Sequence, residues 1–333
     1  IKGAPYMAKV LHGAGSGLDR LAECEACFLT GETKLSETAA FSALYSAQQA
    51  GQHDLAGNAL FILLRLYNIM GDYRGVCDTL EKIDLLASHP DAAGLGIWDV
   101  ARGWFFSEMD AVSKVAGWIL NGAQTGQPPI SVSREFLVRA RCLIATDQDA
   151  QAMALLNHHE EKAAAKNAVI ALLYIDIYRG VIFNRLGDHA AAMHCLKSAY
   201  NRARGNRLVM PFIEYGNRTR SVLERGRNTK GLGVPADWLD QIHAKSATYA
   251  KRHTHLAARF KQEHGHDKSR YSLTKREAEL LSNLSQGLTR DESADSMQLS
   301  LNTVKSMLKQ IYNKLGAINN ADAVRIAVNE HLI

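Results

Sequence analysis

The sequence predicts an all-α protein in which a solenoid of helical hairpins is followed by a smaller four-helix domain. Its 333 residues are 47% hydrophobic, 22% charged and 7% aromatic, which is a globular composition. Alanine is frequent, there are only 6 prolines, and the period-2 runs of Val, Ile and Thr that mark strands are missing. Glycine followed by an acidic residue recurs between apolar stretches of helical spacing, which indicates repeated helix ends.

Two segments, residues 63–73 and 179–189, align with each other. In each, an aromatic residue stands four positions before a glycine (Gly71 and Gly187) that is followed by Asp, and apolar or small residues follow that glycine at +5, +9 and +12. Glycine tolerates a left-handed C-cap, Asp caps the next helix, and the apolar positions share one helix face. We therefore expect helical hairpins that stack side by side.

This spacing resembles the tetratricopeptide repeat at its glycine, aromatic and small positions, although the two copies are not a whole number of repeat periods apart. Gly31 and Gly51 resemble further hairpin boundaries. The resemblance implies a sensor or interaction domain over residues 1–229 whose groove takes a small-molecule inducer or a protein partner. The residues that would bind this ligand are not identifiable from the sequence.

A connector is expected over residues 230–270. It opens with a Gly- and Pro-containing break at 230–235, continues as a helix over 236–261, and ends in a polar linker at 264–269. Basic residues gather ahead of it, and they either attract DNA phosphates or form a solvated helix face: Arg202, Arg204, Arg207, Arg218, Arg220, Arg225, Arg227 and Lys230.

The last stretch, residues 271–333, carries two capping boxes, Thr274 with Glu277 and Thr289 with Glu292. Each predicts a helix start, and Ser300 predicts a third helix that runs to Leu315, with Gly316 as its C-cap. A fourth helix is expected from about residue 320. The third helix has an apolar stripe of Val304, Leu308, Ile311 and Leu315. Its other side carries Asn302, Lys305, Ser306, Lys309 and Asn313 and no acid, as expected of a helix that enters the major groove of DNA.

Residues 273–317 resemble the LuxR-type helix-turn-helix domain. The shared elements are the Leu-Thr-x-Arg-Glu opening, a Gly-Leu-Thr step at 287–289, Ser-x-x-Thr-Val-Lys at 300–305 and Lys-Leu-Gly at 314–316. The resemblance implies base contacts from Lys305, Ser306 and Lys309. It also implies phosphate contacts from Thr289, Arg290, Asn302 and Thr303, and dimer contacts on DNA from Ala323, Val324 and Ala327.

Two features differ from those expected of a helix-turn-helix domain that binds DNA strongly. Ser293 stands where the family has a buried aliphatic residue, and a hydroxyl without a partner there costs ~1 kcal/mol or more. From residue 271 onward the basic and acidic side chains balance. Because neutralisation of phosphates supplies much of the affinity for DNA, we expect this domain to depend on dimerisation or on the basic stretch upstream.

The upstream region resembles that of the large maltose-regulator-type LuxR activators, in which an ATPase module precedes helical repeats. This chain has no Gly-x-x-x-x-Gly-Lys-Ser/Thr phosphate loop, since the glycine-rich residues 13–17 lack the lysine. The chain also opens on Ile1 rather than Met. We expect that any ATPase module lies in a portion that precedes this chain.

No catalytic arrangement stands out, so no enzyme activity, cofactor or metal is expected. Cys24 and Cys27, and the tryptophans Trp98, Trp104 and Trp118, are interpreted as core. The histidines at 253, 255, 264 and 266 are interpreted as solvent-exposed. The odd cysteine count, with neither a secretory signal nor an apolar run long enough to span a membrane, predicts the cytoplasm.

The leading hypothesis is a transcription regulator that binds double-stranded promoter DNA as a homodimer, acts on RNA polymerase and receives its signal through the repeats. Two alternatives stay open. One is a solenoid scaffold for other proteins with a weak or vestigial DNA-binding domain. The other is the C-terminal fragment of an ATP-dependent switch regulator.

Overall fold

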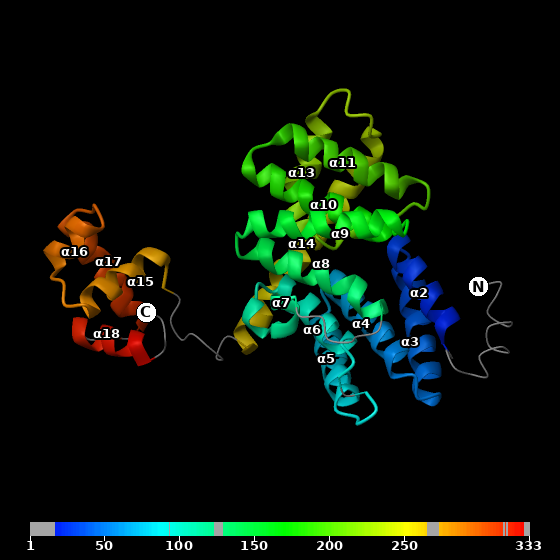
Figure 1. The fold of residues 1–333 in the computed structure, drawn as a ribbon, viewed down its shortest axis with the longest axis horizontal. Helices are drawn as coiled ribbons and strands as arrows, with labels where there is room; N and C mark the ends of the chain where they lie inside the picture. Colours follow the sequence, from blue (N-terminus) through cyan, green and yellow to red (C-terminus); the bar gives the residue numbers. More distant parts are fainter. Residues whose placement is uncertain are drawn as a thin grey trace. The chain divides into compact units, whose positions relative to one another are not determined.

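The computed structural model describes residues 17–92, 94–122, 129–264, 273–315, 317 and 319–329, and this part of the chain is helical with no strand (Figure 1). The chain forms two compact units, residues 1–258 and 259–333. Among the described helices, none is both long and apolar enough to cross a membrane. Residues 13–16 of the glycine-rich segment, residues 265–272 with most of the expected linker, and the expected cap Gly316 lie outside the described residues.

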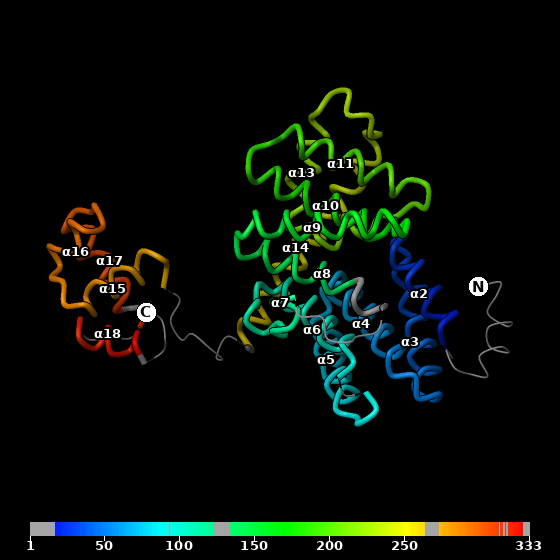
Figure 2. The backbone as a smooth tube through the Cα atoms, viewed as in Figure 1, coloured from blue at the N-terminus to red at the C-terminus, as the bar shows by residue number. Residues whose placement is uncertain are grey.

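The first unit is a row of helical hairpins, which Figure 2 traces from α2 to α14. Its helices are α2 (Leu18–Thr30), α3 (Thr33–Gln49), α4 (His53–Met70), α5 (Tyr73–Ala87), α6 (Ile97–Glu108), η1 (Val112–Lys114), α7 (Gly117–Asn121), α8 (Pro129–Ala145), α9 (Asp149–Ala165), α10 (Val169–Leu186), α11 (His189–Arg204), α12 (Met210–Ile213), α13 (Gly216–Asn228) and α14 (Ala236–His264).

Both hairpins expected from the aligned segments are confirmed. Gly71 ends α4 with φ 73°, and Gly187 ends α10 with φ 84°, in the left-handed region that glycine enters without strain. The carboxylate of Asp72 accepts a hydrogen bond from the Gly75 amide at 3.1 Å, and Asp188 caps α11 in the same way. Local sequence alone therefore sets the end of one helix and the start of the next.

The row of hairpins curls back on itself. Successive helices pack as neighbours, and α12, near the end of the row, packs against α2, at its beginning. The Val209 amide donates a hydrogen bond of 2.9 Å to the Leu29 carbonyl oxygen, which ties the approach to α12 to the end of α2. The solenoid of this unit is thus a closed arc.

Helix α14 belongs largely to this arc. Its side chains Leu239, Ile242, Tyr249 and Leu256 are buried. The expected connector over residues 230–270 is therefore in large part a packed helix, which begins after a break at 229–235 as the glycines there predict. The boundary between the two units lies inside α14.

Charged side chains occupy the core of the arc. The Arg65 guanidinium on α4 donates to both carboxylate oxygens of Glu214, at 3.0 and 2.7 Å, and both side chains are almost fully buried. Glu108 pairs with Arg141 and accepts a hydrogen bond of 2.7 Å from the Tyr249 hydroxyl on α14. These charged groups therefore link helices that are far apart in the sequence, and removal of one partner of such a pair leaves a buried charge without its counter-ion.

Three sequence interpretations can be checked in this core. Cys24 is fully buried and burial raises the pKa of its thiol to about 11, which agrees with a packing role, whereas Cys27 is only half-buried. Trp98 and Trp104 are buried, whereas Trp118 is half-buried. The expected solvent exposure of His253 is wrong, because this side chain is buried against Glu108, where its Nε2 lies 2.9 Å from the backbone oxygen. His266 and the side chain of His264 lie outside the described residues.

The basic stretch ahead of α14 is partly neutralised within the unit. Arg202 pairs with Asp176 and Arg218 with Asp110, at 2.7 and 2.8 Å, and Arg227 pairs with Asp240. These acids lie outside the stretch of sequence in which the arginines looked unopposed. Part of this basic charge is therefore neutralised by ion pairs within the first unit, and fewer arginines remain free to attract phosphate.

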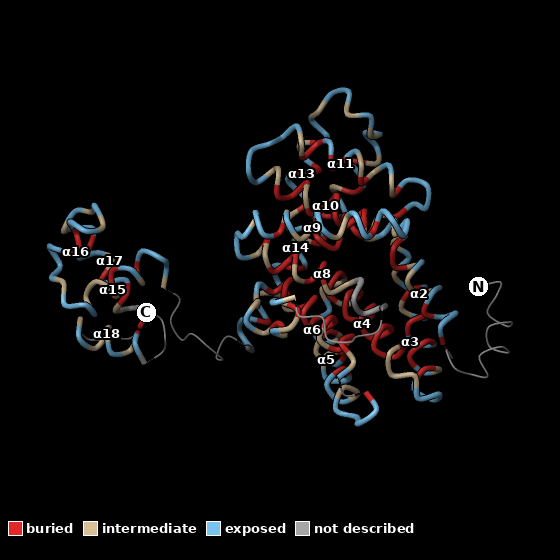
Figure 3. Tube along the Cα trace, in the orientation of Figure 1, coloured by how far each residue is buried: buried red, intermediate tan, exposed pale blue. Residues whose placement is uncertain are grey.

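The second unit has four described helices: α15 (Lys275–Ser285), α16 (Arg290–Ser296), α17 (Leu301–Leu315) and α18 (Asn320–Asn329). Figure 3 shows the buried stretches of these helices facing inward. The core residues are Leu280, Leu281, Ala294, Val304, Leu308, Ile311, Leu315, Ala323 and Ala327. All four helices contribute, as the sequence predicts.

Candidate nucleic-acid interface

Both predicted capping boxes are present. The Thr274 amide donates to the Glu277 carboxylate at 2.6 Å, and the Glu277 amide donates back to the Thr274 hydroxyl at 3.3 Å. The pair Thr289 and Glu292 repeats this at 2.7 and 3.2 Å. Hydrogen bonds from the Thr289 amide and hydroxyl lower the pKa of Glu292. The first backbone N–H groups of a helix have no acceptor within the helix. The capping boxes supply acceptors for them.

A tight turn joins α16 to α17. Met297 ends α16, and Gln298 adopts the left-handed conformation with φ 54°. The Leu299 amide donates to the Ala294 carbonyl oxygen at 2.9 Å, and Ser300 then caps α17 by accepting from the Thr303 amide at 3.1 Å. The turn therefore fixes the direction in which α17 leaves α16.

Helix α17 has the two faces that its sequence predicts. The apolar stripe of Val304, Leu308, Ile311 and Leu315 is at most 2% exposed. The candidate base-contact residues Lys305, Ser306 and Lys309 are exposed on this helix. The side chain of Asn313 lies outside the described residues.

The lysines of α17 have different roles. The Lys314 ammonium contacts both carboxylate oxygens of Glu277 on α15, at 2.8 and 2.7 Å, so it holds the helix in the domain. Among the described residues, no ion pair involves Lys305 or Lys309. Although the basic and acidic side chains of the whole domain balance, α17 contains no acid. Its exposed face is therefore locally positive.

The candidate phosphate-contact residues lie at two helix starts. Arg290 and Asn302 are exposed in the first turns of α16 and α17. The Thr289 hydroxyl donates to Glu292 at 2.8 Å, and the Thr303 hydroxyl lies 2.8 Å from that of Ser300. The two threonines therefore have structural hydrogen bonds already, and backbone amides and the Arg290 guanidinium are the freer donors to a phosphate.

The expected dimer contact on α18 needs a correction. Ala323 and Ala327 are 0% exposed because they pack in the core of the domain itself, so they are not available to a second copy. Of the three residues expected there, only Val324 keeps exposed surface. Val328, which is 50% exposed, is the large apolar side chain that α18 presents to solvent.

Ser293 sits in the core as the sequence comparison with the family suggests. It is fully buried on α16, and its hydroxyl oxygen has no hydrogen-bond partner. The surroundings of this position suit an apolar side chain, and the unpaired hydroxyl there lowers the stability of the domain.

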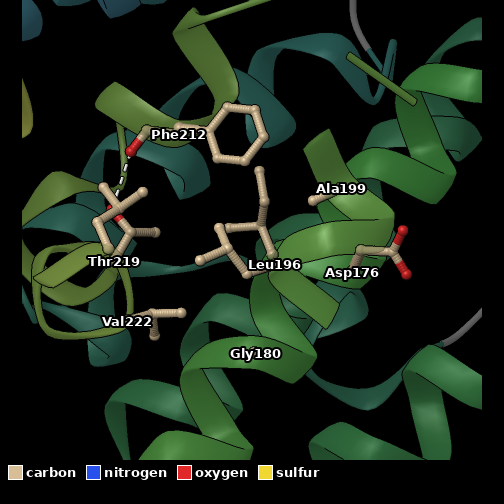
Figure 4. A pocket seen from close by; sticks show the side chains of 9 residues that line it. Asp176, Gly180, Leu196, Ala199, Phe212, Thr219 and Val222 are labelled. Carbon is tan, nitrogen blue, oxygen red and sulfur yellow. Dashed lines mark hydrogen bonds between the residues drawn. The ribbon is translucent and has the colours of Figure 1, made fainter. Parts of the chain in front are cut away.

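Two other places in the first unit were considered as sites. A void of about 10 Å³ lies between α10, α11, α12 and α13. Figure 4 shows side chains that line it, among them Thr219, whose hydroxyl donates a hydrogen bond of 2.9 Å to the Phe212 carbonyl oxygen. The void is about the space of one water molecule and is a packing defect. The ligand atoms of His53, His89 and Asp91 lie within 4.8 Å of one another, a spacing that a divalent cation would fit, but two of the three side chains are exposed.

Two helices joined by a tight turn, with an exposed basic face on the second, define a helix-turn-helix DNA-binding domain. Residues 271–327 match the family described as bacterial regulatory proteins, luxR family. A curated relative, the probable transcriptional regulatory protein SgaR of Hyphomicrobium methylovorum, is 48% identical over 64 residues. That match covers 18% of this chain and 30% of the relative's length. The C-terminal domain of this protein is therefore a LuxR-type helix-turn-helix domain.

Proposed function

We propose that this protein is a transcription regulator that inserts α17 into the major groove of its target DNA. The observation that carries the proposal is the exposed face of α17, on which Lys305, Ser306 and Lys309 stand without an acidic neighbour on the helix. Lysine and serine side chains donate to the acceptors that base edges present in this groove. Arg290 and the amides at the start of α17 would hold the phosphates on either side.

The remaining parts of the proposal concern assembly and signal. Because the domain has balanced charge, two copies on one DNA site would supply the phosphate contacts that one copy lacks. Val324 and Val328 on α18 are the candidate contacts between them. The helical arc would receive a signal, and the DNA-bound form would act on RNA polymerase in the cytoplasm.

The test begins with selection of bound sequences from a random duplex pool by the full chain. The selected site is then titrated with wild type and with Lys305→Ala, Lys309→Ala and Arg325→Ala. Arg325 is the matched control, because it is an exposed cation of the same domain that pairs with Asp322 at 2.7 Å. Fluorescence anisotropy at two salt concentrations reports both the affinity and its salt dependence.

Each α17 variant is expected to weaken binding by about 1–3 kcal/mol if its lysine contacts a base. Such a variant also relaxes the base preference at one position of the selected site. A loss that is uniform over sequences, with a salt slope reduced by about 1, would instead place that lysine on a phosphate. Binding by both variants that equals the Arg325→Ala control would overturn the assignment of α17 as the reading helix.

A further inference from the structure

The arc of the first unit holds a chamber of about 940 Å³ that opens to solvent. It is lined from α2, α4, α6, α8 and α10 and by the segment at 206–208, so residues far apart in the sequence meet there. Its size falls in the range of sites for small organic molecules. Most of its wall is apolar or aromatic, with Leu21, Phe61, Trp104, Leu137, Ile170 and Tyr174 among the lining residues.

The charged groups on the wall favour an anion. The lining includes two guanidinium groups, Arg65 and Arg134, and one carboxylate, Glu25. Arg65 is committed to the core, where Glu214 and the Tyr174 hydroxyl hold it, and it is 5% exposed. Arg134 is therefore the cation that a ligand can engage.

Arg134 is paired with a carboxylate that solvent can reach. Its guanidinium donates to the Glu25 carboxylate at 2.5 Å and to the Asn58 side-chain oxygen at 2.9 Å, and it lies over the Phe61 ring at 5.3 Å. The Glu25 side chain is 34% exposed, so water can solvate it when the pair opens. The Arg134 side chain is 16% exposed, so the guanidinium needs an anionic partner, but that partner can be exchanged because the Glu25 side is open to water. A ligand carboxylate can therefore take the place of Glu25 on Arg134, with two parallel hydrogen bonds.

We propose that the chamber binds a small organic acid, with its carboxylate on Arg134 and its apolar or aryl body against Phe61, Leu137 and Trp104. This inference rests on the proposed sensing function of the arc and gives it a ligand class. Arg134 orients the acid, and the displaced Glu25 carboxylate turns to solvent. The aromatic wall excludes water from the body of the ligand and supplies the apolar burial that drives its binding.

The chamber also has a physical link to α14. The Trp104 ring lies 4.9 Å from the Arg65 guanidinium carbon and 4.0 Å from that of Arg141. Arg141 pairs with Glu108, which accepts from the Tyr249 hydroxyl of α14 at 2.7 Å. A ligand that moves Trp104 therefore changes the surroundings of an ion pair that anchors α14, the helix that crosses from the first unit to the second.

The experiment measures binding of matched probes to the full chain without DNA. The probes are 3-phenylpropionate, octanoate, their two neutral amides and 3-phenylpropylamine. Tryptophan fluorescence and calorimetric titration report binding. The two acids are expected to bind about tenfold or more tightly than their amides, because a hydrogen bond to a charged group exceeds a neutral one. The amine is expected not to bind, since Arg134 repels it.

Two variants test whether Arg134 binds the carboxylate of the ligand or only supports the wall of the chamber. Arg134→Ala is expected to weaken acid binding about tenfold to a hundredfold, with little effect on the amides. Glu25→Gln is expected to tighten acid binding, because it removes the competing carboxylate while its amide keeps the shape of the wall. Arg179→Ala is the control, since Arg179 pairs with Glu160 at 2.7 Å and does not line the chamber.

Acids that bind no better than amides, or a Glu25→Gln variant that binds acids more weakly than wild type, would overturn the proposal. Binding of none of the five probes would overturn it too. The Lys305→Ala variant is expected to keep full acid binding. A failure of the chamber to bind acids is therefore distinguished from a failure of α17 to bind DNA, because the two kinds of binding are measured separately.

Discussion

The ammonium group of Lys314 on α17 lies 2.7 Å from a carboxylate oxygen of Glu277 on α15. The same carboxylate closes the capping box of α15 through the Thr274 amide. Burial by itself raises the pKa of Glu277, but the hydrogen bonds from Lys314 and Thr274 outweigh it, so the pKa lies below its usual value. One carboxylate therefore caps the first helix of the DNA-binding domain and anchors its reading helix.

This arrangement predicts acid sensitivity of the domain. Because the pKa of Glu277 is depressed in the folded state, its ionised form stabilises the fold above the unfolded pKa of about 4.3. That contribution is lost as pH falls through the lower folded-state pKa. Glu277→Gln is expected to lower the melting temperature near neutral pH and to reduce its drop toward about pH 3. Thermal unfolding by circular dichroism measures both.

The control for that experiment is Glu279→Gln, an exposed carboxyl on the same helix that caps nothing in the described structure. Its melting temperature should follow wild type across the pH range. A Glu277→Gln curve parallel to wild type at every pH would contradict the role assigned to this carboxylate.

Ser293→Ala is expected to stabilise the second unit by about 1 kcal/mol, because it removes a buried hydroxyl that has no partner. Urea unfolding measures the change. Ser296→Ala, on the exposed side of the same helix, is the opposing case: its hydroxyl accepts a hydrogen bond of 3.1 Å from the Asn283 side-chain amide, and the variant should lose about 0.5–1 kcal/mol. DNA affinity should be unchanged in both variants, since neither side chain lies on α17. A destabilised Ser293→Ala protein would show that the hydroxyl has a partner in solution.

Gly180→Ala is expected to stabilise the first unit by about 1 kcal/mol, since Gly180 is inside α10 and alanine is the better helix former. A Cβ there would meet the Cys195 Cβ at 3.5 Å and the Ala192 carbonyl oxygen at 3.7 Å, which are ordinary contacts beside the void in Figure 4. Gly216→Ala is the opposing case, because its Cβ would lie 2.8 Å from the Ser246 backbone oxygen. Urea unfolding should show the first variant gaining stability and the second losing it.

Glu214→Gln is expected to cost about 3–5 kcal/mol, because it leaves the Arg65 charge in the core without its counter-ion. The double variant Arg65→Met/Glu214→Leu should cost less than the single one, since no buried charge is left unpaired. Denaturant unfolding of the wild type, the two single variants Arg65→Met and Glu214→Leu, and the double variant gives the coupling between the two sites. Additive losses would show that the pair does not act as a unit.

The helix boundaries of the DNA-binding domain could be predicted from the sequence to within a residue or two. The capping boxes of Thr274 and Thr289, the Ser300 cap and the stripe from Val304 to Leu315 all rest on interactions between residues three or four positions apart. The same holds for the hairpins at Gly71 and Gly187. Such features are local, so the order of residues specifies them directly.

Only the tertiary structure decided which surfaces remain available. Ala323, Val324 and Ala327 are all small or apolar residues of α18, but packing among four helices buries the two alanines fully and leaves the valine partly exposed. Arg65 and Glu214 are 149 positions apart, and no periodicity indicates that they meet. The chamber, likewise, exists because the arc of hairpins brings α12 back against α2. Its walls come from five helices, and their meeting depends on that closure rather than on any motif within one of them.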